Sequence, residues 1–249
     1  MGLIRDWKAL LRSWRIYHSN PAQDRVMDAL YARFIKPGDL VFDVGAHIGH
    51  RTASFLRLGA RVVAVEPQRE AARFIRLLYG LRGKVTVVQA ICGRQVGTAT
   101  LHVNADNPLV STASDAFIAS AQGADGWREQ RWDERVTSPM TTVDALRAQH
   151  GAPAFIKIDV EGFEADVLAG LNEAPPALSF EFTLIQRDEA YACMARCAQI
   201  GLTRFNASIG ESHVLAFADP VDSATLRAWI AGLPASANSG DIYAIRPTP

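Results

Sequence analysis

Strand patterns and helix patterns alternate along this sequence from residue 40 onward, and this alternation limits the possible folds more than any other feature. Strands are predicted at 40–44, 61–66, 84–89, 97–103, 135–141, 154–159, 177–182, 201–206, 212–217 and 241–246, and helices at 50–58, 68–79, 143–149, 162–171, 187–199 and 222–232. Several strands, among them 62–65, are continuously apolar, as strands covered on both faces should be. The alternation therefore predicts an α/β fold with a mostly parallel sheet and helices on both faces.

Two regions fall outside this alternation. Residues 1–36 are predicted to form an N-terminal helical extension, ahead of a domain at 37–249. The amphipathic helix expected at 3–17 suits packing on that domain, contact between two copies of the chain, or a membrane surface, since Trp, Leu and basic residues favour all three. Residues 104–134 are rich in Asn, Asp, Ser, Ala and Gly and include Trp127 and Trp132. We expect this segment to be an insertion with a short helix at 115–121, acting as a lid over the site where the substrate binds.

The composition narrows the classes of partner. Lys plus Arg (26) balances Asp plus Glu (26), so the net charge does not favour nucleic acid or an anionic membrane. Cys92, Cys193 and Cys197 lack the spacing of a metal site with histidine, and we expect them to be small buried residues in a reducing compartment. No apolar run is long enough to span a bilayer. These features predict a cytoplasmic protein.

A turn with two glycines follows the first strand, in the stretch VFDVGAHIGHRT at 41–52. Glycine lets a ligand approach the backbone closely, and the helix that follows presents unpaired amides. Gly45 and Gly49 do not have the spacing of the dinucleotide motif G-x-G-x-x-G, and Asp43 before the turn would repel a phosphate. The turn therefore predicts a cationic ligand rather than a pyrophosphate.

The second strand adds a carboxylate to this turn. It ends in Glu66, about twenty residues after the glycines, where nucleoside-binding α/β folds hold the ribose hydroxyls. Asp43, Gly45, Gly49 and Glu66 together indicate a nucleoside that carries a positive charge and no phosphate. S-adenosylmethionine fits that description.

Six stretches of the chain resemble the FkbM family of class I, S-adenosylmethionine-dependent methyltransferases. They are VFDVGAHIGHRT, VVAVEP, VVQAICGRQVGTATLHV, SPMTTVDAL, FIKIDVEGFEADVLAG and GDIYA, and they extend from about residue 37 to residue 246. Many methyltransferases share the glycine turn, whereas K-I-D-V-E-G-x-E is distinctive of this family. The resemblance implies a Rossmann-like sheet of seven strands in the order 3-2-1-4-5-7-6, with the last strand antiparallel. It also implies methyl transfer to an oxygen of a sugar, a glycan or a natural product.

The resemblance implies which residues contact the cofactor. Glu66 would bind the ribose, and the end of strand 84–89 would frame the adenine. The predicted cofactor-binding residues are Asp43, Gly45, Ala46, His47, Gly49, Glu66, Gln89, Ala90 and Asp159.

Four ionisable residues, Lys157, Asp159, Glu161 and Glu181, are predicted to form the catalytic group. The implied strand order brings them to one edge of the sheet, and on a regular strand the first three would share a face. A lysine in an apolar strand needs a partner, for which Asp159 and Glu181 are the candidates. The group would orient the acceptor hydroxyl, and Glu161 or Asp159 would remove its proton.

Several alternatives remain open from the sequence. The charged group could be an ion pair that only holds the sheet edge, or its acids could hold Mg²⁺. His47 or His50 could serve as the base in place of a carboxylate. The chain could also be a cofactor-binding partner of a glycan-modifying enzyme without catalysis of its own, or an NAD-dependent oxidoreductase.

Overall fold

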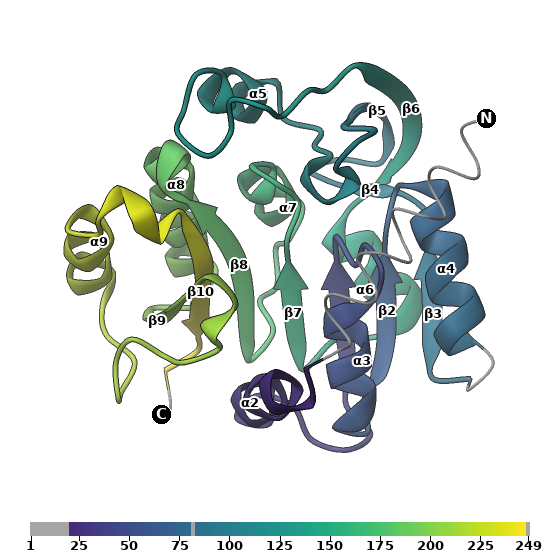
Figure 1. Cartoon of the computed structure of the whole chain (residues 1–249). Coiled ribbons are helices and arrows are strands. Elements are labelled where there is room, and N and C mark those ends of the chain that lie inside the picture. Colours follow the sequence, from purple (N-terminus) through teal and green to yellow (C-terminus); the bar gives the residue numbers. More distant parts are fainter. Residues whose placement is uncertain (1–19, 81–82, 248–249) are drawn as a thin grey trace.

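The structure of the protein is a computed structural model, which describes residues 20–80 and 83–247. Seven strands of this part form one twisted sheet (Figure 1). From one edge to the other they are β3 (Val85–Val88), β2 (Arg61–Val65), β1 (Leu40–Val44), β7 (Phe155–Ile158), β8 (Ala177–Thr183), β10 (Ser239–Ile245) and β9 (Arg204–Ile209). β10 pairs antiparallel with both of its neighbours, and the other pairs are parallel. This arrangement confirms the predicted class and the order 3-2-1-4-5-7-6.

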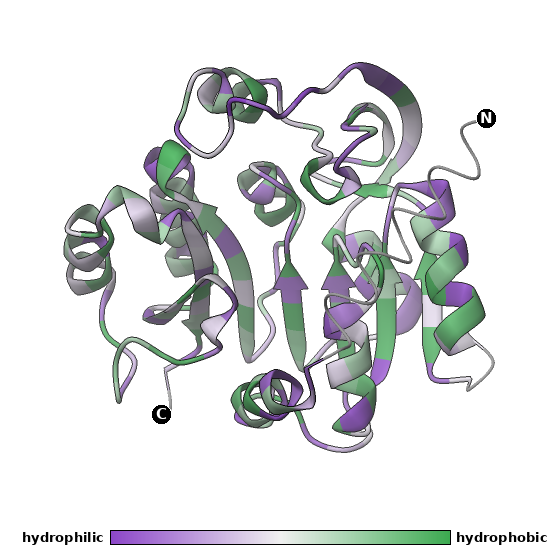
Figure 2. Ribbon diagram, in the orientation of Figure 1, coloured by the Kyte–Doolittle hydropathy of each residue, from purple (hydrophilic) through white to green (hydrophobic). Residues whose placement is uncertain are grey.

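Helices cover both faces of this sheet, because alternate strand residues point to opposite sides and are apolar on both. On one face lie α2 (Pro21–Tyr31), α3 (His50–Arg57) and α4 (Arg69–Tyr79), whose core residues include Met27, Phe55 and Ile75. On the other lie α6 (Val143–His150), α7 (Glu164–Ala169), α8 (Arg187–Gln199) and α9 (Ser223–Ala231). Figure 2 shows mostly hydrophobic central strands, with hydrophilic bands towards the upper ends of β7 and β8.

A smaller sheet lies above the carboxyl ends of the main sheet in Figure 1. It has three strands in the order β4 (Ile91–Cys92), β6 (Glu134–Thr141) and β5 (Gly97–Val103), with β5 and β6 antiparallel. The strands predicted at 97–103 and 135–141 are therefore present but do not join the main sheet. Between them run a 3-10 turn, Pro108–Val110, and α5 (Asp115–Ala121), which lies where a short helix was predicted. Phe117, Ala121 and Trp127 form a small apolar cluster, against which Ile185 of the main domain packs.

The strand predicted at 201–206 is present but shifted to β9 (Arg204–Ile209), and the separate strand predicted at 212–217 is wrong. The chain instead forms one strand, β9, followed by a 3-10 turn at Gly210–Ser212 and a loop. Gly210 and His213 have positive φ values of 49° and 51°, which redirect the chain and prevent a second strand. The helix predicted at 3–17 lies outside the described residues.

Two further observations concern burial and membrane crossing. Cys92, Cys193 and Cys197 are all free and buried, as predicted. Across the described ranges, no helix combines the length and the apolar character that crossing a bilayer requires.

Candidate functional site

The loop between β1 and α3 carries the two glycines and is fixed to the end of β2. The amides of Gly45 and Ala46 donate to the carbonyl of Val65 at 2.9 and 3.1 Å. The amide of His47 donates to one carboxylate oxygen of Glu66 at 2.8 Å, and the amide of Gln68 donates to the other at 2.8 Å. A carboxylate has about four acceptor positions, so Glu66 retains acceptor capacity for a ligand.

Gly45 packs directly against the loop that follows β7. Its φ is 82°, and a β-carbon at this position would overlap the backbone carbonyl of Asp159. The sequence predicted that something approaches the backbone here, and in this structure a part of the chain itself does so. The contact places Asp159 beside the glycine turn.

A small cavity lies beside the glycine turn. Glu66 and His47 line one part of it, and an apolar wall is formed by Val65, Ala90, Ile91, Leu101 and Phe163. A nucleoside fits this division, because ribose hydroxyls can donate to the buried carboxylate while a purine packs on the apolar wall.

His47 supplies a second indication that a ligand belongs in this cavity. Its two ring nitrogens are buried and have no hydrogen-bond partner among the described residues. Burial lowers the pKa of His47 to about 4, so the ring is neutral near pH 7 and can donate from one nitrogen and accept at the other. Buried polar atoms without partners are uncommon in proteins, and a bound cofactor would satisfy these.

Four residues predicted to bind the cofactor do not line this cavity: Asp43, Ala46, Gly49 and Gln89. Ala46 lines only a second cavity, described below. Asp43 is 1% exposed and accepts a hydrogen bond of 2.5 Å from the Thr52 hydroxyl, so it fixes α3 to β1. Its pKa is raised to about 6 because it is buried. Gly49 begins α3 with a φ of 81° and packs against Tyr79. Gln89 is exposed and lines a separate groove with Pro67.

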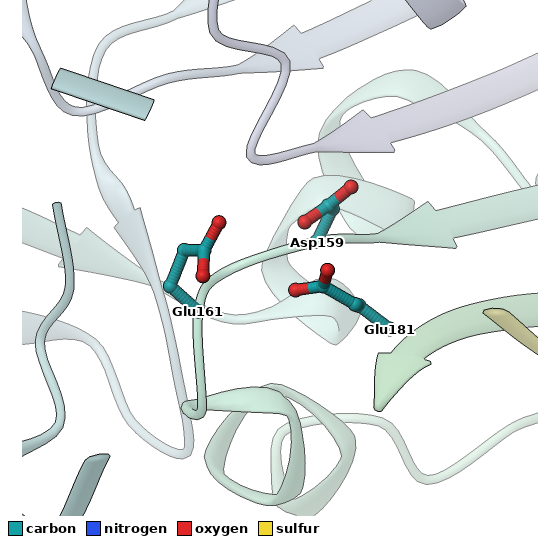
Figure 3. Close-up of side chains that lie close together, drawn as sticks. All are labelled: Asp159, Glu161 and Glu181. Atoms are coloured by element: carbon teal, nitrogen blue, oxygen red, sulfur yellow. The ribbon is translucent and has the colours of Figure 1, made fainter. Parts of the chain in front are cut away.

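Asp159, Glu161 and Glu181 form an acidic cluster at the carboxyl ends of β7 and β8 (Figure 3). One carboxylate oxygen of each lies within 4.8 Å of the others, a spacing at which the three acids could hold a divalent cation. The predicted strand 154–159 ends one residue early, at Ile158, and Glu161 has a φ of 55°. The expectation that Lys157, Asp159 and Glu161 share one strand face is therefore wrong, and the turn brings Glu161 to the others instead.

Burial and mutual repulsion raise the pKa values of two acids of this cluster. The pKa of Glu161 is raised well above its ordinary value, first by burial and then by the charges of Asp159 and Glu164. The pKa of Glu181 is raised by burial and by Glu161. One carboxylate oxygen of Glu181 is buried and has no hydrogen-bond partner in the described residues. A cation, or an acceptor that brings donors, would relieve both conditions.

Lys157 lies beneath this cluster with a fully buried side chain. Its ammonium donates to Asp159 at 3.1 Å, which is one of the two predicted partners, and to Asp241 at 2.8 Å. No hydrogen bond to the other candidate, Glu181, occurs among the described residues. Sequence reasoning missed Asp241, although it belongs to the stretch GDIYA and its strand neighbours β8 in the implied order.

A second, wider cavity meets the first at the acidic cluster. Five residues line both cavities: Gly45, His47, Leu109, Asp159 and Glu161. The remaining wall is largely polar and includes His50, Arg51, Asn107, Glu181, Glu211, Asn238 and Ser239, together with Trp127. The acids therefore stand between the cavity that Glu66 lines and a wider cavity with many polar residues in its wall.

The insertion at 104–134 contacts the loop after β7 that carries K-I-D-V-E-G-x-E, here called the signature loop. The Thr112 hydroxyl donates to the carbonyl of Glu161 at 2.7 Å, and Phe117 packs against Gly162 so closely that a β-carbon there would clash. Glu164, the last residue of K-I-D-V-E-G-x-E, accepts from the amide of Val160 at 2.9 Å. The loop that carries Asp159 and Glu161 is thus held on both sides.

Comparison with known proteins gives the family. The chain matches the Methyltransferase FkbM domain over residues 43–192, which is more than half of its length. Ribosomal RNA small subunit methyltransferase A of Anaeromyxobacter dehalogenans (strain 2CP-C) is 43% identical over 74 residues, or 29% of this chain and 25% of that protein. The corresponding protein of Anaeromyxobacter sp. (strain K) is 37% identical over 86 residues, or 34% and 30%. The chain thus spans less than a third of the length of these curated relatives.

Solved structures of methyltransferases overlay on most of the chain at low identity. A TehB-like S-adenosylmethionine-dependent methyltransferase from Corynebacterium glutamicum is 9% identical, with 97% of each chain covered and a TM-score of 0.49. An O-methyltransferase from Bacillus cereus, in complex with SAH, is 10% identical, with 96% of this chain and 91% of that chain covered and a TM-score of 0.47. The assignment rests instead on the family match and on the strand order of this structure. The chain therefore belongs to the FkbM family of S-adenosylmethionine-dependent methyltransferases.

Proposed function

We propose that this methyltransferase transfers its methyl group to a hydroxyl oxygen of a sugar, a glycan or a related natural product. The observation that carries the proposal is the position of Asp159 and Glu161. These two residues line both the cavity beside Glu66 and the wider cavity next to it. A reacting hydroxyl held in the wider cavity would meet the cofactor's reactive end at these carboxylates.

The residues of the chain would perform three tasks. When bound, S-adenosylmethionine supplies an electrophilic methyl group, and the protein aligns the acceptor with it. Glu66 and His47 would hold the nucleoside, as their burial and free acceptor capacity allow. Glu161, when ionised, would accept the proton of the acceptor hydroxyl, and its raised pKa makes that carboxylate a stronger base than an exposed glutamate.

The wall of the second cavity supports a polyhydroxylated acceptor. Arginine, histidine, asparagine and serine side chains alternate along it with carboxylates, so hydroxyl groups would find both donors and acceptors. Trp127 also lines this cavity, although most of its ring is buried against Phe117. Asn107, Leu109, Val110 and Trp127 all come from the insertion, which supports its predicted role as a cover of the acceptor site.

A metal-assisted version of the same reaction has a specific observation in its favour. Asp159, Glu161 and Glu181 could hold a Mg²⁺ ion that polarises the acceptor hydroxyl. EDTA would then abolish methyl transfer and added Mg²⁺ would restore it. Activity that is unaffected by EDTA would leave the carboxylate alone as the base.

The acceptor class distinguishes this proposal from its alternatives. The two relatives described above are ribosomal RNA methyltransferases by name, but their match covers a limited part of each protein, and the balanced charge of this chain does not favour RNA. A cofactor-binding partner without catalysis would bind S-adenosylmethionine and methylate nothing. The family match favours methyl transfer over NAD chemistry.

The test is transfer of a radiolabelled methyl group from S-adenosylmethionine to a panel of mono- and oligosaccharides, glycosylated natural products and ribosomal RNA. We expect label in a hydroxylated sugar or natural product, at an ether oxygen located by mass spectrometry. Label in RNA alone, or in none of the acceptors despite tight cofactor binding, would contradict the proposal.

A further inference from the structure

The buried ammonium of Lys157 has a complete set of acceptors. It donates to Asp241 at 2.8 Å, to Asp159 at 3.1 Å and to the carbonyl of Ile158 at 3.2 Å. An ammonium group has three hydrogens, and these three acceptors account for all of them. The direction of the Lys157 side chain is therefore fixed by its partners as well as by the sheet around it.

The two carboxylates that hold this ammonium differ in their surroundings. Asp241 is 4% exposed and lies outside the lining of both cavities, whereas the Asp159 side chain is 32% exposed and lines both. Asp241 comes from the antiparallel strand β10 and pairs in register with Glu181 of β8, so these two carboxylates share one face of the sheet. The Lys157 ammonium bridges Asp241 to Asp159, which lines both cavities.

We propose that Asp241 is a positioning residue of the cofactor site, which holds the Lys157 ammonium and through it fixes the carboxylate of Asp159 at the junction of the two cavities. The backbone of Asp159 is already located by its packing against Gly45. The hydrogen bonds from Lys157 to Asp241 and to Asp159 also fix the orientation of the Asp159 side chain. The inference concerns cofactor binding and rests on Asp159 as a cofactor-binding residue, as the family resemblance implies. It does not depend on the acceptor or on the proposed O-methylation.

The proposal makes a specific forecast for a double-mutant cycle. Asp241→Asn removes the charge but keeps an oxygen that can accept from Lys157. Asp159→Asn makes the same change in the other carboxylate that Lys157 contacts. We expect each variant of the full-length protein to bind S-adenosylhomocysteine about tenfold more weakly by isothermal titration calorimetry, since each disturbs a charged hydrogen bond. The double variant should lose little more than either single variant, because both changes act through the same contact. Asp219→Asn, at an exposed loop position, is the control and should leave the affinity unchanged.

A second pair of variants separates positioning from a merely structural role. Lys157→Met leaves Asp241 as an unpaired buried charge and should lower the thermal midpoint strongly. Adding Asp241→Asn removes that charge and should restore much of the stability. If Asp241 acts through Lys157 on Asp159, cofactor affinity stays low in this double variant although stability recovers. If the pair only supports the sheet, affinity recovers together with stability.

Three outcomes would overturn the inference. The first is an unchanged affinity of folded Asp241→Asn for S-adenosylhomocysteine. The second is a roughly hundredfold loss of affinity in the Asp159→Asn/Asp241→Asn variant, which would mean that the two changes act independently. The third is recovery of both stability and affinity in the Lys157→Met/Asp241→Asn variant. None of these measurements needs an acceptor, so a failure of the proposed O-methylation would leave them interpretable.

Discussion

The carbonyl oxygen of Asp159 lies against the α-carbon of Gly45, so closely that no side chain fits between the glycine turn and the loop after β7. This contact joins the two stretches that define the site, VFDVGAHIGHRT and KIDVEGFE. The glycine at position 45 therefore serves the assembly of the site before any ligand binds.

Gly45→Ala should destabilise the protein and abolish measurable binding of S-adenosylhomocysteine. Alanine is strained at a φ of 82°, and its β-carbon would push Asp159 away from the turn. The matched control is Gly38→Ala, because Gly38 has a similar φ of 91° but nothing within 4 Å of a β-carbon. Thermal unfolding and calorimetric titration of both variants separate the strain from the overlap. Equal effects of the two substitutions would show that the contact with Asp159 is unimportant.

Glu66→Ala should weaken binding of S-adenosylmethionine at least tenfold. Hydrogen bonds to a charged group contribute about 1.5–3 kcal/mol each, and ribose hydroxyls would lose such bonds. The variant also removes the acceptor of the His47 amide, so circular dichroism must show that the fold is retained. An unaltered dissociation constant in a folded variant would remove Glu66 from the cofactor site.

Glu66 should also make the stability of the ligand-free protein depend on pH. Burial raises its pKa in the folded state from 4.5 to about 7. Between these values the folded protein keeps a proton that the unfolded chain releases, so the free energy of unfolding falls as the pH rises through this window. The loss is at most about 3 kcal/mol, from 1.36 kcal/mol for each pKa unit.

Glu66→Gln is the variant that isolates this effect, because it cannot titrate. Asp43 and Glu164, whose pKa values are raised to about 6 and about 7, titrate in the same window in both proteins. Urea unfolding at pH 5 and pH 8 should therefore show a smaller decrease for Glu66→Gln than for the wild type. Equal decreases would mean that Glu66 is ionised in the folded protein throughout this range.

The sequence predicted the architecture better than the details of the site. The apolar strands, the helix at 187–199 and the strand order implied by the resemblance all agree with the structure, since hydrophobic periodicity and topology determine them. The turn at Glu161 could not be anticipated in the same way. A positive φ at a glutamate has no local sequence signal, and the close packing around the loop, including Phe117 on Gly162, sustains it.

Asp241 was missed for a different reason. It lies 84 residues from Lys157 in the sequence, and only the side-chain directions of three neighbouring strands bring the two together. Asp43 shows the same limit, since its type and position favour ligand contact but do not reveal its hydrogen bond with Thr52. Local patterns identified which residues are unusual, but not which partner each one has.

The insertion at 104–134 is predicted to close over the cofactor and acceptor. Thr112 and Leu109 link it to the signature loop and to both cavities. Hydrogen exchange of this segment should slow when S-adenosylhomocysteine binds, whereas the last turn of α8, none of whose residues line either cavity, should be unaffected. Thr112→Val should reduce this protection, because the hydrogen bond to Glu161 is lost. Exchange that is equally slow with and without ligand would identify the segment as a fixed wall.

The central claim is that the acidic cluster deprotonates an acceptor hydroxyl beside the cofactor, and Glu161→Gln tests it most directly. This substitution keeps the size of the side chain but removes its capacity to accept a proton. With an acceptor found by the labelling panel, the thermal midpoint, the affinity for S-adenosylmethionine and the turnover should be measured on the same preparation. We predict nearly unchanged cofactor affinity, an intact fold and turnover reduced about 10²–10⁴-fold, the usual contribution of a positioned base. Normal turnover in a stable, cofactor-binding Glu161→Gln protein would contradict the account.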